Sequence, residues 1–175
     1  ITTNAPTAVP TTEPSTPPSV RVCDASICAH GDNSLTVSVS YDGTVFEQLS
    51  YESTWWTTTE LSLTDIVAPT VLHFEVDDYD HTGGFLATVR LQCNDGYNAT
   101  IITDDGNTHF DVIYSLNDQM TMTEFTPFGS GAQSGSVNED TVECMDSEAF
   151  WMWNGLNTDD VIFELDLFPE TTTTM

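Results

Sequence analysis

Leu35-Thr36-Val37-Ser38-Val39-Ser40-Tyr41 alternates apolar and hydroxyl-bearing side chains almost without a break. Successive side chains of an extended strand point to opposite faces, so this segment buries one face and exposes the other. The same alternation recurs at 61–63, 72–76, 85–91, 110–114, 120–122, 149–153 and 161–167. Turn pairs such as Asp42-Gly43 and Asp95-Gly96 lie between these segments. The pattern predicts about eight to ten short strands and no helix, and we expect an all-β, antiparallel β-sandwich.

Composition divides the chain into three parts. Residues 1–19 hold five prolines and six threonines, which predicts an extended Pro/Thr-rich N-terminal arm. Residues 20–168 form the predicted sandwich, with a long loop at 129–142, and 169–175 form a Thr-rich tail. The arm is expected to mediate assembly and to carry O-linked glycans. The hydroxyls expected to carry them belong to Thr2, Thr3, Thr7, Thr11, Thr12, Ser15 and Thr16.

The charge balance is extreme. The chain has 28 acidic residues against two arginines and no lysine, a net charge of −26, although 39% of its residues are hydrophobic. That apolar content suffices for a core, so the acidic residues must lie at the surface. Nucleic acids and anionic membranes are bound through Lys and Arg, so both are excluded as partners. We expect an extracellular, secreted protein that attracts divalent cations and does not insert into a membrane.

The four cysteines, Cys23, Cys28, Cys93 and Cys144, allow three disulfide pairings. Their wide spacing favours disulfides over a zinc site, which usually contains close pairs. Among the three pairings we prefer Cys23–Cys28 with Cys93–Cys144. The sequon Asn98-Ala99-Thr100 predicts an N-linked glycan on Asn98, in a surface loop.

An acidic loop carries the most specific motif. The segment 72–87, LHFEVDDYDHTGGFLA, runs from a predicted strand through an Asp-x-Asp pair to a Gly-Gly turn and the next strand. Asp78 and Asp80 project to the same side of an extended segment, and calcium prefers oxygen ligands. The segment resembles the third calcium loop of C2 domains. The stretch 35–41 is similar to the second strand of that family, and the resemblance covers about residues 20–115.

The resemblance implies a C2-like or immunoglobulin-like sandwich with calcium as its ligand. The implied metal ligands are Asp78 and Asp80, with Asp77 beside them and Asp32 from the first loop. The chain departs from the family at Gly83-Gly84, which stands where a further loop aspartate is usual. The alternative interpretation is a solvated acidic turn, because Asp-x-Asp pairs arise by chance in so acidic a chain.

No arrangement of residues predicts catalysis. The chain has no Gly-x-Ser-x-Gly elbow, and without lysine it has neither a Schiff-base residue nor a phosphate-binding loop. We therefore expect that the protein is not an enzyme. The aromatic cluster at 150–153 is most simply a set of core residues. Trp55 and Trp56 are adjacent, so one of them is expected to face outward, toward a partner subunit or a glycan.

Two functional hypotheses follow. In the first, the protein is a structural subunit of an extracellular glycoprotein filament, a homopolymer that forms head to tail. The arm of one copy would lie along a sheet edge of the next. The expected contacts with the partner copy are Val9, Val20, Trp55 and Trp56. The alternative is a monomeric, calcium-dependent carbohydrate-binding module of the lectin-like or C2-like kind.

Overall fold

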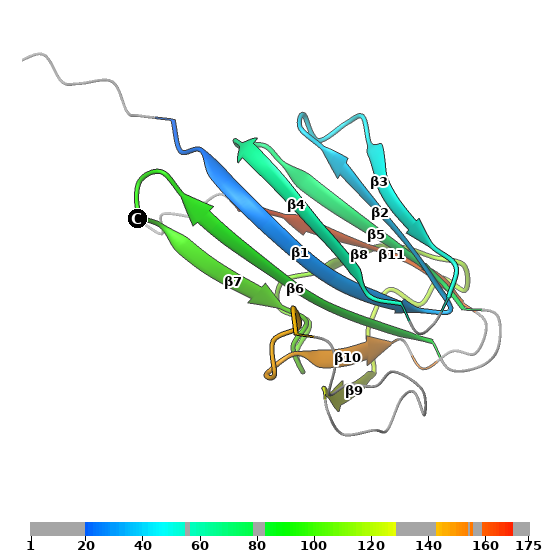
Figure 1. Ribbon diagram of the computed structural model, residues 1–175. Helices are drawn as coiled ribbons and strands as arrows, with labels where there is room; N and C mark the ends of the chain where they lie inside the picture. The colour runs from blue at the N-terminus through cyan, green and yellow to red at the C-terminus, as the bar shows by residue number, and fades with distance from the viewer. Residues whose placement is uncertain are drawn as a thin grey trace, which may run out of the picture.

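The computed structural model describes residues 20–54, 57–78, 83–128, 143–153, 155 and 159–169. Within them the chain is all-β, as predicted, and forms two antiparallel sheets that pack against each other (Figure 1). Sheet A contains β1 (Cys23–Asp32), β4 (Thr59–Ile66), β6 (Gly84–Cys93), β7 (Asn98–Ile102), β9 (Glu124–Pro127) and β10 (Phe150–Trp153). Sheet B contains β2 (Ser34–Ser40), β3 (Glu47–Glu52), β5 (Val71–Asp77), β8 (Asp111–Ser115) and β11 (Asp160–Asp166).

The centre of sheet A is the pairing of β1 with β6, which runs from Cys23 opposite Cys93 to Asp32 opposite Gly84. Strand β4 pairs with the other edge of β1. Beyond β6, strand β7 pairs with one half of that strand, and β10 meets the other half at Phe85. Sheet B has the order β3-β2-β5-β11-β8.

The core between the sheets is rich in phenylalanine. Phe85 of β6 stacks on Phe163 of β11, with ring centroids 4.4 Å apart, and both side chains are fully buried. Phe74 and Phe110 complete the cluster at centroid distances of 5.2 to 5.9 Å. Burying one such side chain contributes about 1.5–3 kcal/mol, so this cluster is a large part of what holds the two sheets together.

Most of the predicted strands are confirmed. The alternation at 35–41 corresponds to β2, whose Leu35, Val37 and Val39 are buried in the core. The strand predicted at 120–122 is wrong. That segment is irregular, and of its residues only Met122 is buried in the core. The next strand, β9, begins at Glu124. The sequence patterns did not reveal β1, β3, β7 or β9.

The Gly83-Gly84 pair was predicted as a turn, and Gly84 is instead the first residue of β6. Gly83 lies directly against the indole ring of Trp153, where a Cβ atom would overlap the ring. Close packing of an aromatic ring therefore requires glycine at this position.

A second, smaller apolar cluster covers half of the outer face of sheet A. Cys28 of β1 and Leu86 of β6 point outward there, and Met145, Ala149 and Trp151 lie over them. The aromatic cluster 150–153 is thus a core segment, as expected, and serves both apolar clusters. None of the described segments covers the other half of this face.

The disulfides are Cys23–Cys93 and Cys28–Cys144. The preferred pairing of Cys23 with Cys28 is wrong. Both residues lie on β1 and are separated by about 16 Å at 3.3 Å per residue, whereas bonded cysteines need Cα atoms within about 7 Å. Their odd spacing also turns the two side chains to opposite faces. Cys23 therefore bonds across to β6, and Cys28 bonds outward to the segment that covers sheet A.

Several predictions fall outside the described residues. These are the arm with its hydroxyls and Val9, the pair Trp55-Trp56, Asp80, the loop at 129–142, and the tail from 170 onward. Among the described residues, none forms a helix long and apolar enough to cross a membrane. The two disulfides fit a protein that folds in an oxidising compartment.

Removing the outer disulfide should uncover the second apolar cluster. We expect Cys28→Ala with Cys144→Ala to lower the free energy of unfolding by about 3–5 kcal/mol, because this bond closes a long loop, with a sequence separation of 116. Urea denaturation followed by tryptophan fluorescence measures the loss. The double variant Cys23→Ala with Cys93→Ala is the control, and it should leave the emission wavelength of Trp151 in the native state unchanged. Replacing Trp151 by Phe in each protein identifies the part of the spectrum that comes from Trp151. Equal spectra in the two double variants would contradict this account.

Candidate functional site

Acidic residues gather where β5 and β11 meet at one end of the sandwich. Asp77, the last residue of β5, pairs with Ser34 of β2 on one side and with Asp160 of β11 on the other. The Ser34 hydroxyl donates a hydrogen bond to Asp77 Oδ2 at 2.8 Å. The backbone N–H of Asp78 donates to the carbonyl of Asp159 at 3.1 Å. The pairing of strands thus brings these carboxylates together.

Asp159 has a structural role at this end. Its carboxylate is fully buried and accepts hydrogen bonds from the Ser115 hydroxyl at 2.7 Å and from both the backbone and the side-chain N–H groups of Asn117 at 3.1 Å. These bonds tie the turn after β8 to the start of β11. A buried carboxylate is stable only when its oxygens are satisfied in this way.

Partial burial, and after it the crowding of like charges, raises the pKa of two of the acids. Partial burial, followed by the charges of Asp77, Asp159 and Asp78, raises the pKa of Asp160 above its ordinary value of 3.8. Burial and the charges of Asp77 and Asp160 likewise raise the pKa of Glu75. Repulsion between these groups opposes folding at neutral pH.

The structure places three of the four predicted calcium ligands in the described residues. Asp32 ends β1, Asp77 ends β5, and Asp78 follows it; Asp32 and Asp78 are buried. The described residues hold no group of three or more acidic, histidine or cysteine side chains placed to bind a metal ion. They do not make a calcium site by themselves. Because Asp80 lies outside them, calcium binding by this loop stays a prediction.

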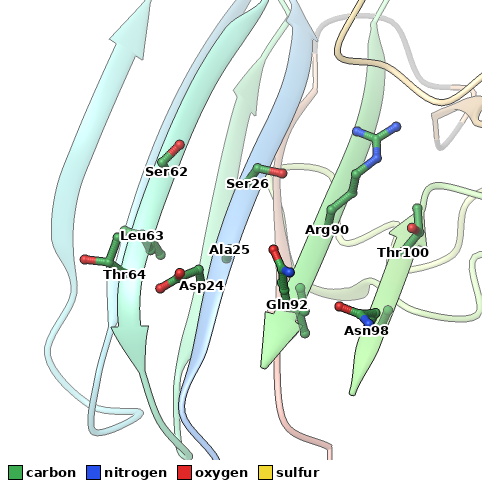
Figure 2. Close-up of a pocket in the computed structure, with 12 residues that line it drawn as sticks. Asp24, Ala25, Ser26, Ser62, Leu63, Thr64, Arg90, Gln92, Asn98 and Thr100 are labelled. Carbon is green, nitrogen blue, oxygen red and sulfur yellow. The ribbon is translucent and has the colours of Figure 1, made fainter. Parts of the chain in front are cut away.

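A hollow of about 720 Å³ lies on the other half of the outer face of sheet A (Figure 2). Strand register aligns its side chains in rows. Ser62 of β4 and Arg90 of β6 both pair with Ser26 of β1, and Arg90 also pairs with Thr100 of β7. All four side chains face the hollow. Short hydroxyl-bearing side chains therefore form much of its floor.

A second row of side chains lies two residues further along the same strands. Gln92 of β6 pairs with Asp24 on one side and with Asn98 on the other, and all three line the hollow. Two smaller hollows, of about 290 and 240 Å³, share lining residues with the large one. Together they form one trough along β1 and β6. Cys144, held to β1 by its disulfide, stands at one end of the trough, and Asn94 stands at the other.

Arg90 is fixed in the wall of the trough. Its guanidinium donates a hydrogen bond to the carbonyl of Cys144 at 2.7 Å and lies 3.6 Å from the carboxylate of Asp146. Two contacts leave further N–H groups of the five-donor guanidinium available, and the side chain is 41% exposed. The residue therefore presents an oriented donor to whatever enters the trough.

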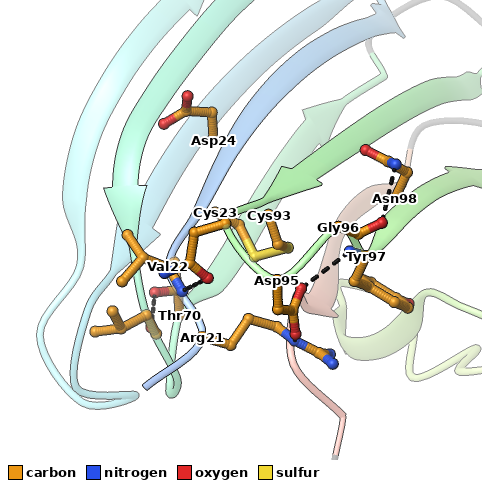
Figure 3. The surroundings of a disulfide bond; sticks show 12 residues. Arg21, Val22, Cys23, Asp24, Thr70, Cys93, Asp95, Gly96, Tyr97 and Asn98 are labelled. Carbon is orange, nitrogen blue, oxygen red and sulfur yellow. Dashed lines mark hydrogen bonds and ion pairs between the residues drawn. A yellow bond between two sulfur atoms is a disulfide. The ribbon is translucent and has the colours of Figure 1, made fainter. Parts of the chain in front are cut away.

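The turn between β6 and β7 lies at the end of sheet A that holds the Cys23–Cys93 disulfide (Figure 3). Arg21 bonds to the carboxylate of Asp95 at 2.7 Å and lies over the ring of Tyr97, 4.4 Å from its centroid. The backbone N–H of Tyr97 and the Arg21 side chain lower the pKa of Asp95. The Asn98 amide donates to the carbonyl of Gly96 at 3.2 Å. Both arginines of the chain thus border sheet A.

Most exposed sheet edges are protected against pairing with another chain. Strand β4 has an irregular register opposite the start of β1 and carries Glu60 and Asp65. Strand β3 has a register shift opposite Val37 and Ser38, and β8 has one opposite Ile162 and Phe163. Strand β9 is four residues long and contains proline and glutamate. Bulges, charges and prolines are the usual means of preventing edge-to-edge association.

Strand β7 lacks these protections. Its sequence, Asn-Ala-Thr-Ile-Ile, has no charge and no proline, and its pairing with β6 is regular over all five residues. Within the described residues no strand pairs with its other edge. Ala99 and Ile101 face the core and are only half-buried. Of the edge strands in the described part of the chain, β7 is the one best suited to accept another strand.

The comparisons with known proteins add no assignment: no family model, no curated protein and no solved structure matches this chain. Of the predicted partner contacts, only Val20 is described, and it is 68% exposed. The sequon at Asn98 and Thr100 was visible in the sequence, whereas Arg90 and the hollow around it were not. The pairing of four distant segments creates that site, and no local motif marks it.

The acidic end yields a test of its electrostatics. Because the native pKa of Asp160 lies above 3.8, the native state binds a proton before the unfolded state does as the pH falls. Ionisation of Asp160 therefore lowers the free energy of unfolding as the pH rises from about 4 toward neutrality. We expect Asp160→Asn to raise the melting temperature at pH 7 and to match the wild type near pH 4. The control Glu60→Gln removes an exposed charge from β4. An Asp160→Asn protein less stable than wild type at pH 7 would show that charge repulsion at this end does not oppose folding.

Proposed function

We propose that this protein is a non-enzymatic structural subunit of an extracellular, homopolymeric filament that assembles by strand addition at β7. The observation that supports the proposal most is the regular, uncharged open edge of β7 beside bulged, acidic or proline-bearing edges elsewhere. An added strand gains main-chain hydrogen bonds along such an edge. At a net charge of −26, two copies repel each other over most of their surfaces, so an uncharged edge is where they can meet.

The hydrogen-bond pattern defines which atoms of β7 are available. Cys93 N–H bonds to Tyr97 O at 2.9 Å, and Thr103 N–H bonds to Ala87 O at 3.0 Å, one at each end of the β6–β7 ladder. In an antiparallel ladder the residues alternate, so Ala99 and Ile101 turn their N–H and C=O groups toward β6. Those of Asn98, Thr100 and Ile102 therefore point to the open edge.

The arm has a sequence suited to that edge. Between residues 6 and 14 its prolines recur every four positions, at 6, 10 and 14, and two more follow at 17 and 18. The N–H groups of a strand point alternately to its two edges, so the prolines at 6, 10 and 14 remove donors from one edge only. The other edge keeps the donors of Thr7, Val9 and Thr11, and the stretch 7–11 equals β7 in length. Pairing of this stretch with β7 of the next copy is a head-to-tail contact, which propagates into a fibre.

Deleting residues 1–19 tests the donor. We expect the shortened chain to keep the β-sheet circular dichroism spectrum and to form no fibres in negative-stain electron microscopy, because the donor strand is gone while every described strand remains. The full-length chain under the same conditions should form fibres with a repeat of one domain. Fibres from the shortened chain, or only single particles from the full-length chain, would overturn the proposal.

Thr100→Pro tests the acceptor. Proline removes an N–H group that points to the open edge and leaves the ladder to β6 intact. We expect the critical concentration for assembly to rise about tenfold or more, which corresponds to about 1.4 kcal/mol. Thr100→Val is the matched control, because it also loses the hydroxyl and the sequon but keeps the N–H. Both proteins are made in a bacterial periplasm so that no glycan is attached. Equal assembly by the two variants would argue against β7 as the acceptor.

A further inference from the structure

The trough on sheet A is separate from the open edge of β7, although the two share Thr100. The side chain of Thr100 lines the trough, whereas its backbone N–H faces the edge. A molecule lying on the face of the sheet would therefore leave the edge free.

The side chains that point outward from sheet A into the trough are polar, although the core-facing Ala25, Leu63, Leu91 and Ala99 also contribute to its floor. Ser26, Ser62 and Thr100 offer hydroxyls, which both donate and accept hydrogen bonds. Gln92 adds an amide with two donors and an acceptor, Arg90 adds a positive charge, and Asp24, Glu60 and Asp65 add negative charges. Neighbouring strands are about 4.8 Å apart. The polar side chains of the row from Ser62 to Thr100 therefore follow one another at a spacing close to the length of a sugar ring. Among the described residues, no aromatic side chain lines the trough.

These features distinguish between classes of ligand. An apolar ligand would leave the hydroxyls and amides without partners, which is unfavourable. An anionic ligand would meet Asp24 nearby and a net charge of −26 overall. A neutral ligand with many hydroxyls satisfies the lining and is not repelled. We propose that the trough on the outer face of sheet A binds a neutral oligosaccharide.

The oligosaccharide has two possible sources. One is a separate polysaccharide, and the other is an N-linked glycan on Asn98 of the chain itself. Asn98 is exposed in the second row of the trough. Strand β4, on the far side of the trough, lies three strand spacings from β7, about 14 Å away. A glycan of a few sugar rings on Asn98 is long enough to cover that distance. Glycosylation replaces one N–H of the Asn98 amide, so the other can keep the bond to Gly96.

Binding in the trough should be weak and independent of calcium. Without an aromatic platform the affinity depends on hydrogen bonds, each of which contributes about 0.5–1.5 kcal/mol net. A polymer that displays many troughs would compensate through multivalency. The carboxylates along the trough are Asp24, Glu60 and Asp65, and within the described residues they do not form a group of three placed to bind a metal ion, so a chelator should not weaken the interaction. This distinguishes the trough from the calcium-dependent module that the sequence suggested.

The test uses the full chain in two forms. Protein from a bacterial periplasm carries a bare Asn98, whereas protein secreted by yeast can carry the glycan. The bare form is titrated with neutral gluco-, xylo-, manno-, galacto- and chito-oligosaccharides in chelator, and with an oligogalacturonate as the anionic comparison. Amide chemical shifts of Ser26, Ser62 and Gln92 report binding by nuclear magnetic resonance. The yeast form is recorded before and after digestion with an endoglycosidase.

Ser62→Trp fills the trough, and Gln48→Trp, at an exposed position of β3, is the matched control. We expect shifts in the bare form with at least one neutral probe, at least tenfold weaker binding for Ser62→Trp, and unchanged binding for Gln48→Trp. If the chain's own glycan is the occupant, the same amides shift in the yeast form and return after digestion. No shift with any neutral probe and none with the glycan would overturn the proposal, as would equal loss in both variants. Fibre formation is scored separately, so failure here leaves the assembly proposal intact.

Discussion

The antiparallel pairing of β1 with β6 is the constraint on which the rest of the structure depends. It runs the full length of both strands, from Cys23 opposite Cys93 to Asp32 opposite Gly84. On its inner face this pair contributes Phe85 to the aromatic core that joins the two sheets. On its outer face it carries Cys28, whose disulfide to Cys144 fixes the cover over half of the sheet. The half that no described segment covers forms the trough, and β7 pairs with β6 on the side away from β1. Both proposed surfaces therefore follow from one pair of strands.

The charge distribution is compatible with the association that we propose for so acidic a chain. The acids on β3, β4 and β9 lie on exposed edges, and those around Asp77 and Asp160 crowd one end of the sandwich. Repulsion between like charges discourages most contacts between copies. The β7 edge carries no charge. The row from Ser62 to Thr100 contains one charged residue, Arg90, which lies beside Asp146. Association through hydrogen bonds to backbone or sugar is then the mode that the surface permits.

The sequence predicted the fold class well and the sites poorly, for physical reasons. The period of two revealed β2, β5 and β11 because one face of each is buried in the core. It missed β1, because the small residues Ala25 and Ala29 form its inner face and part of its outer face is also buried. The disulfide preference failed because short sequence separation does not bring Cys23 and Cys28 together on a straight strand. The trough could not be predicted, because its rows depend on the register of four strands. The acidic loop was visible from sequence, and its calcium binding stays a prediction.

Residue-resolved hydrogen exchange of assembled protein tests the central claim, strand addition at β7, most directly. The claim requires that the amides of Thr100 and Ile102, which face the open edge, become protected when full-length protein assembles, relative to the unassembled chain lacking residues 1–19. The amides of Ala99 and Ile101, already bonded to β6, should change little. Protection that appears at other edges while Thr100 and Ile102 exchange as fast as in the monomer would contradict the account.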